Sequence, residues 1–197
     1  MEKLSEAILH HARNRPEGVP LSAKGLLHLG SRAAVDQALS RLARRGDLLR
    51  AGRGLYLLPV KSRFGSRAPS LQKTVEALAA QRGERIASSG AMAANTLGLT
   101  TQVPVRPVFL TSGRSRKLKL GRQEVELRHA PPWQLVLSGR KAGDAVRALA
   151  WLGPERAGTA LDVIGGSLSL EERRELADVS AQMPGWLAGP VSRLTHG

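Results

Sequence analysis

The chain of 197 residues contains no cysteine. Without a thiol it can form no disulfide, no zinc site with thiolate ligands and no covalent intermediate on a cysteine nucleophile. Aromatic residues make up only 3% of the sequence, so few side chains are present on which unpaired bases could stack. This scarcity argues against a single-strand binder of the stacking type.

Long hydrophobic runs are also missing. No apolar stretch approaches the roughly 20 residues that a helix needs to span a bilayer. The first six residues, MEKLSE, lack the basic and then apolar order of a secretory signal. We therefore expect a cytoplasmic protein without a membrane partner.

Motifs for catalysis or metal binding are absent as well. Among the histidines, His10 and His11 are neighbours on a predicted helix and point in different directions, and the others stand apart without a carboxylate at ligand spacing. No Walker loop and no Gly-x-Ser-x-Gly motif occurs, and His129 has no evident acid partner. The sequence predicts no metal, no cofactor and no catalytic residue, so we expect a protein that is not an enzyme.

Positive charge, in contrast, is abundant and unevenly distributed. The chain has 30 Lys and Arg against 16 Asp and Glu, a formal charge of +14. Residues 1–67 carry +8, residues 68–140 carry +7 and residues 141–197 carry −1. Such a balance favours a polyanion as partner for the first two thirds of the chain.

Residues 31–45 have the pattern of a recognition helix. Ser31 is suited to cap its first turn, and Gly46 to end it. Apolar residues recur at helical spacing on one face, which predicts a buried stripe of Val35, Ala38, Leu39 and Leu42. The opposite face carries small, hydrogen-bonding and cationic side chains of the kind that fit a major groove.

A short hairpin is predicted directly after this helix, with strands near residues 48–50 and 55–58. The glycines of the connecting Ala-Gly-Arg-Gly permit a tight turn with Arg53 at its tip. Helical patterns at 4–13 and 23–29, the second capped by Ser22, precede the recognition helix, and this order is that of a winged helix-turn-helix. The predicted DNA-binding residues are Ser31, Arg32, Ala33, Gln37, Ser40, Arg41, Arg44, Arg50 and Arg53.

An ordinary surface helix followed by an ordinary hairpin is the alternative, since charged outer faces are common on soluble helices. Binary patterning alone would not, however, place a Gly-Arg-Gly tip directly after a basic helix. We therefore favour the DNA-binding interpretation.

The remaining sequence predicts an α+β fold in two domains. A winged helix-turn-helix at 1–60 is followed by a basic linker at 61–69 and a mixed domain at 70–197. In that second domain we expect a helix capped by Ser70 and ending near Gly83, a helix capped by Ser89, a small sheet within 105–129 and helices over 142–194.

Residues 111–120 form a second basic run. A glycine with several cations after a strand can bind phosphate through backbone amides and charge. Four cations within six positions repel one another, which makes them a candidate surface for an acidic partner or for nucleic acid: Arg114, Arg116, Lys117 and Lys119. A solvated hairpin is the alternative.

These segments resemble the AbiEi family of antitoxins of type IV abortive-infection systems. The resemblance is carried by RLARRGDL and GRGLY within residues 31–59, SGAMAANTLGL at 89–99 and VFLTSGRSRKLKL at 108–120, and it extends over about residues 1–165. It implies a winged helix that represses its own operon by binding duplex promoter DNA with inverted repeats. It also implies a C-terminal domain that opposes a nucleotidyltransferase-like toxin, often without a stable complex.

Two functions therefore remain open. The first is an autorepressor and antitoxin, with Arg44, Arg50 and Arg53 in its DNA-binding module. The second is a winged-helix transcription regulator with a small-molecule effector site in its C-terminal domain. A neighbouring gene for a nucleotidyltransferase would favour the first.

Overall fold

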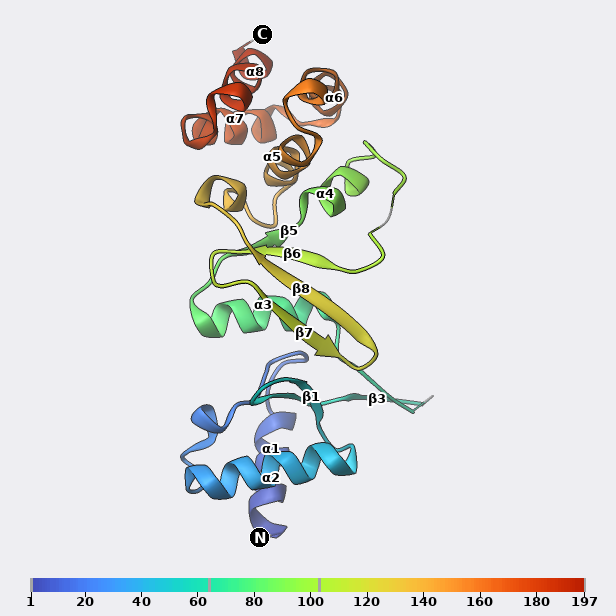
Figure 1. Cartoon of the computed structure of the whole chain (residues 1–197), viewed down its shortest axis with the longest axis vertical. Coiled ribbons are helices and arrows are strands. Elements are labelled where there is room, and N and C mark those ends of the chain that lie inside the picture. The colour runs from blue at the N-terminus through green and yellow to red at the C-terminus, as the bar shows by residue number, and fades with distance from the viewer. Residues whose placement is uncertain (1, 64, 103, 197) are drawn as a thin grey trace. The chain divides into compact units, whose positions relative to one another are not determined.

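The computed structural model describes residues 2–63, 65–102 and 104–196 and has the expected α+β fold (Figure 1). The chain divides into two compact units. The first contains residues 1–83 and 117–125, and the second contains residues 84–116 and 126–197.

The first unit begins with the helices and hairpin that the sequence predicts. Its elements are α1 (Glu2–Arg13), the 3-10 turn η1 (Ala23–Leu26), α2 (Arg32–Arg45), β1 (Leu49–Gly52) and β2 (Leu55–Leu57). The predicted stripe of α2 is confirmed, because Val35, Ala38, Leu39 and Leu42 are all buried. They pack in one core with Ile8 of α1.

Local signals set the ends of α2 as expected. The Ser31 hydroxyl accepts a hydrogen bond from the Ala34 N–H at 3.3 Å. Gly46 adopts a φ of 81°, a left-handed conformation that costs glycine little, and ends the helix.

The hairpin has one further partner that the sequence did not indicate. Leu21 pairs with Tyr56 in an antiparallel bridge, with N···O distances of 2.8 and 3.0 Å. A single bridged residue has no periodicity, so pattern reading cannot detect it. The bridge ties the segment after α1 to the hairpin.

Two predictions for this region were wrong. The helix expected at 23–29 is only the 3-10 turn Ala23–Leu26, in which Ser22 accepts from the Gly25 N–H. The expected linker at 61–69 contains two antiparallel strands, β3 (Val60–Ser62) and β4 (Gly65–Arg67). Gly65, with a φ of 108°, permits the turn between them, and the Ser62 hydroxyl donates to the Gly65 carbonyl at 2.9 Å.

Helix α3 (Leu71–Arg82) belongs to the first unit, which differs from the domain boundary expected from the sequence. Glu17, after α1, accepts from the Ser70 N–H and from Lys73 Nζ, both at 2.9 Å. These bonds fix the start of α3, where the Ser70 side chain makes no capping bond.

The sheet of four strands has the order β5-β6-β8-β7. Its strands are β5 (Ile86–Ser88), β6 (Val108–Thr111), β7 (Arg116–Leu120) and β8 (Gln123–His129). β5 pairs with β6 in antiparallel fashion, and β6 pairs with β8 in parallel. The strand expected from residue 105 begins only at Val108, because Pro104 and Pro107 have no N–H to donate to a ladder.

Helices make up most of the second unit: α4 (Gly90–Thr96), η2 (Pro132–Leu135), α5 (Lys141–Leu152), α6 (Pro154–Ser167), α7 (Leu170–Val179), η3 (Ser180–Gln182) and α8 (Gly185–His196). Figure 1 shows α5 to α8 gathered around one core. Small side chains let α4 approach α5 closely, with Ala93, Ala94 and Ala148 fully buried between them. The Ser89 cap of α4 is confirmed.

None of the helices in the described ranges has the length and apolar character needed to cross a membrane.

Candidate nucleic-acid interface

The solvent face of α2 gathers the side chains predicted to contact DNA. Ala33, Gln37, Ser40 and Arg44 are exposed and Arg41 is half-buried. Their spacing of three and four residues puts them on one side of the helix, opposite the buried stripe. The Ser40 hydroxyl lies 3.4 Å from the Tyr56 hydroxyl, so it also connects α2 to β2.

Ion pairs occupy the two ends of α2. Arg32 Nε lies 2.9 Å from an Asp36 carboxylate oxygen, and Arg45 lies 2.9 Å from Asp47. Arg44 differs from both, because no carboxylate in the described ranges pairs with it. Its charge is therefore available to a polyanion.

The hairpin β1–β2 presents two more arginines. Arg50 and Arg53 are exposed, and the carboxylates of the described residues form no ion pair with either. Arg53 lies in the turn, where Gly54 has a φ of 67°. A backbone of this kind lets the turn approach a surface closely, since glycine adds no side chain there.

The hairpin β3–β4 adds a basic surface that sequence reasoning treated as a linker. Lys61, Arg63 and Arg67 are all exposed. Arg67 is partly neutralised, because its Nη1 lies 3.4 Å from Glu17. The alternating pattern that identifies a strand cannot develop over three residues, which explains why this hairpin was not predicted.

Charge is concentrated in the unit that contains these elements. The first unit has 18 Lys and Arg against 7 Asp and Glu, a formal charge of +11, and the second unit has a formal charge of +3. A positive field of this kind attracts polyanions and speeds their association.

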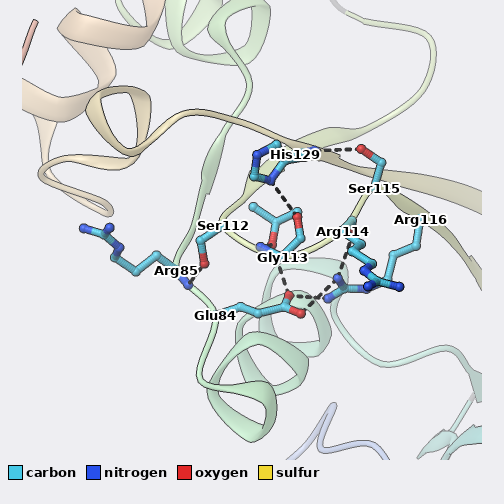
Figure 2. Close-up of polar contacts among 9 residues, drawn as sticks. Glu84, Arg85, Ser112, Gly113, Arg114, Ser115, Arg116 and His129 are labelled. Atoms are coloured by element: carbon cyan, nitrogen blue, oxygen red, sulfur yellow. Dashed lines mark hydrogen bonds and ion pairs between the residues drawn. The ribbon is translucent and has the colours of Figure 1, made fainter.

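The second basic cluster, around Arg114, is built differently (Figure 2). Arg116 is largely buried and binds Glu84 through both terminal nitrogens, with N···O distances of 3.1 and 2.5 Å. Lys117 pairs with Glu124 at 3.0 Å. Arg114 and Lys119 are exposed and have no ion pair with any carboxylate of the described residues.

Two backbone amides of this loop already have hydrogen-bond partners. The Ser112 N–H donates to the Arg85 carbonyl, and the Gly113 N–H donates to the Thr111 hydroxyl, both at 3.0 Å. A Cβ on Gly113 would lie 2.3 Å from the Glu84 carboxylate, so the glycine is explained by the ion pair beneath it. These two amides are not available to hold a phosphate.

His129 lies beside the same loop. Its backbone N–H donates to Ser115 Oγ at 2.9 Å, and its ring Nδ1 lies 2.9 Å from the Gly113 carbonyl oxygen (Figure 2). Because a carbonyl only accepts, Nδ1 must carry the proton in this bond. Nε2 is then the ring nitrogen that remains for other contacts.

The other histidines are less dispersed than expected. The His28 ring, expected to stand apart, lies 5.2 Å from the ring of His11. Burial, followed by the charge of Arg15, lowers the pKa of His11 below its ordinary value. Within the described ranges, no group of three or more His, Cys, Asp or Glu residues is placed to hold a metal ion.

Arg147 on α5 is a prominent charged residue that sequence reasoning missed. Its side chain is fully buried and donates to Asp144 at 2.8 Å, to the Ser88 hydroxyl at 3.3 Å and to the Val136 carbonyl at 3.2 Å. An arginine within the apolar pattern of a helix gives no sign of these partners, one of which lies on its own helix and two elsewhere in the chain. Its role here is to join β5 to α5.

The model of one protein family, described as a family of unknown function (DUF6088), matches residues 7–163. No curated protein and no solved structure matches the chain significantly. The family match covers most of the sequence, including the candidate interface on α2 and the loop beside His129.

Proposed function

The chain belongs to the family of unknown function DUF6088, and we propose that it is a repressor that binds duplex promoter DNA through α2 and the hairpin β1–β2. The observation that carries the proposal is the solvent face of α2, where Gln37 and Arg44 lie opposite a fully buried stripe. The bridge between Leu21 and Tyr56 supports it, since it fixes the hairpin against the helical part.

In the proposed complex, α2 enters the major groove and the hairpin lies along the backbone. Gln37 and Arg44 carry the donors that recognise adenine and guanine edges. Arg50 and Arg53 bind phosphates, which position the protein without reading sequence. Inverted repeats in the operator would place two copies on one face of the DNA.

Fluorescence anisotropy with the full-length protein tests this proposal. The probes are a duplex from upstream of its own gene and a shuffled duplex of equal length. Gln37→Ala and Arg44→Ala should each weaken promoter binding by about 1–3 kcal/mol and affect the shuffled duplex much less. Arg82→Ala, an exposed arginine of α3, is the matched control and should bind both duplexes like the wild type.

Equal losses on both duplexes would assign these side chains to the DNA backbone. A wild-type protein that binds the two duplexes with the same affinity would contradict the repressor itself.

We further propose that the protein is the antitoxin of a type IV abortive-infection system, opposing a nucleotidyltransferase-like toxin. The support is its resemblance to the AbiEi family over about residues 1–165. Within the basic cluster, the candidate residues are Arg114 of the second unit and Lys119 of the first, because both are exposed whereas Arg116 and Lys117 already pair with carboxylates.

Co-expression with the product of the adjacent gene tests the antitoxin role, with growth as the readout. Wild-type protein should restore growth. Arg114→Glu with Lys119→Glu should abolish rescue, and Arg174→Glu on α7 should not. If no adjacent gene product is toxic, or if the double variant still protects, the respective parts of this proposal fail.

A further inference from the structure

The second unit contains a cleft of about 290 Å³ that none of the proposed activities uses. Its floor is one face of the pair β6–β8. Val108 and Leu110 alternate along β6 and so share a face, and Arg128 stands beside Leu110 in the parallel register. Gly90 of α4 and Trp151 of α5 line the opposite wall.

Two polar side chains, Arg128 and His129, line this cleft from the end of β8. The loop at 113–115 holds His129 through the bonds to Gly113 and Ser115, so its Nε2 has a fixed position. Arg128 donates from Nε to Glu126 at 3.0 Å. That bond does not use the two terminal nitrogens of its guanidinium, which match the oxygens of a phosphate group.

Arg147 also lines the cleft, but its role differs. Four of its five N–H donors are taken by Asp144, Ser88 and two backbone carbonyls. It therefore stiffens the wall, and the groups offered to a ligand are the Arg128 guanidinium and His129 Nε2.

Trp151 supplies an aromatic surface at the same cleft. The chain has only three tryptophans, and this residue is 42% exposed. A Cβ on Gly90 would lie 2.4 Å from Trp151 Cβ and 2.5 Å from the Arg147 carbonyl oxygen. Glycine is therefore needed for α4 to pack against the residue that carries the indole.

We infer that this cleft binds a nucleoside monophosphate, with the base against Trp151, the phosphate on Arg128 and a sugar hydroxyl donating to His129 Nε2. An indole face suits any nucleobase, since stacking needs only a π surface. A forked cation beside a positioned imidazole suits a phosphate and the sugar hydroxyls next to it. The site lies wholly within the second unit and does not depend on DNA binding by the first.

Isothermal titration calorimetry of the full-length protein tests this inference. The probes are the four ribonucleoside monophosphates, adenosine and inorganic phosphate. At least one monophosphate should bind, and it should bind about tenfold or more tightly than inorganic phosphate because stacking adds affinity. Arg128→Gln and Trp151→Leu should each weaken it by about tenfold or more.

Matched controls come from the same unit. Arg174→Gln on α7 and Trp186→Leu on α8 remove an exposed arginine and an exposed tryptophan outside the cleft, and both should bind like the wild type. Thermal melts confirm that every variant is folded.

The inference is overturned if no monophosphate binds at millimolar concentration. It is overturned equally if inorganic phosphate binds as tightly as the nucleotide, because the indole would then contribute nothing. Binding that survives both cleft substitutions would place the ligand elsewhere.

Discussion

Arginine serves opposite purposes in the two units. In the first, Arg44, Arg50 and Arg53 face solvent and have no carboxylate partner among the described residues. In the second, Arg147 is fully buried among four polar partners and Arg116 is largely buried against Glu84. These three arginines are exposed and unpaired among the described residues, whereas the two of the second unit join separate segments of the fold, although Arg114 and Arg128 of that unit are also exposed.

This difference shows that a count of cations does not locate a binding surface. Residues 68–140 carry +7 and invite the same interpretation as the first 67 residues, yet some of that charge is already paired within the protein. Burying a guanidinium is costly unless its donors are satisfied. A buried arginine is therefore explained by the groups around it, whereas an exposed arginine still has donors available to an external partner.

Truncating one buried and one exposed arginine gives the largest expected difference between the two units. Arg147→Ala leaves Asp144, Ser88 and two carbonyls without their donor, and we expect it to lower the free energy of unfolding by about 4 kcal/mol. Arg44→Ala should change it by less than about 0.5 kcal/mol. Chemical denaturation followed by circular dichroism measures both. Similar losses for the two variants would mean that the arginines are not used differently.

Neutralising one carboxylate compares a buried ion pair with an exposed one. Glu84→Gln leaves Arg116 without its counter-charge in a site where the two side chains are only 17% and 13% exposed, and should cost about 3 kcal/mol. Glu126→Gln, whose pair with Arg128 is 60% and 35% exposed, should cost at most about 1 kcal/mol. The same denaturation curves give the answer. A ranking in the reverse order would show that the buried pair does not brace the loop at 111–116.

A smaller, pH-dependent effect is expected at Glu17 in the first unit. The hydrogen bond from Lys73, then that from the Ser70 N–H, lowers the pKa of Glu17 from 4.5 to about 2. A lowered pKa in the folded state stabilises the fold above pH 4.5, and this contribution is lost as the pH falls towards 2.

The melting temperatures of the wild type and of Glu17→Gln should therefore differ most above pH 5 and converge between pH 4.5 and 2. If the difference between the two melting temperatures stayed constant over that interval, Glu17 would not hold the start of α3.

The sequence predicted most helices well, for identifiable reasons. Helix α2 has 14 residues with a regular apolar stripe, and its cap at Ser31 and its end at Gly46 are local signals that need no knowledge of the rest of the chain. α7 also begins with a local signal, a capping box of Ser169 and Glu172, which the sequence analysis did not use.

Contacts between distant segments could not be predicted in the same way. Glu84 meets Arg116 across 32 positions, and Ser88 meets Arg147 across 59. The parallel pairing of β6 with β8 likewise depends on what surrounds both strands. The candidate face of α2 could be found from sequence because it is local, whereas the cleft beside Trp151 could not, because its walls come from four separate segments.

The most direct test of the claim that the first unit binds DNA is the salt dependence of promoter affinity. The account predicts that Arg50→Gln with Arg53→Gln lowers the slope of log affinity against log salt by about 2 in magnitude, since each lost phosphate contact removes about 0.9. Arg174→Gln with Arg193→Gln in the second unit should leave the slope unchanged. An unchanged slope in the first pair, or an equal fall in the second, would contradict the account.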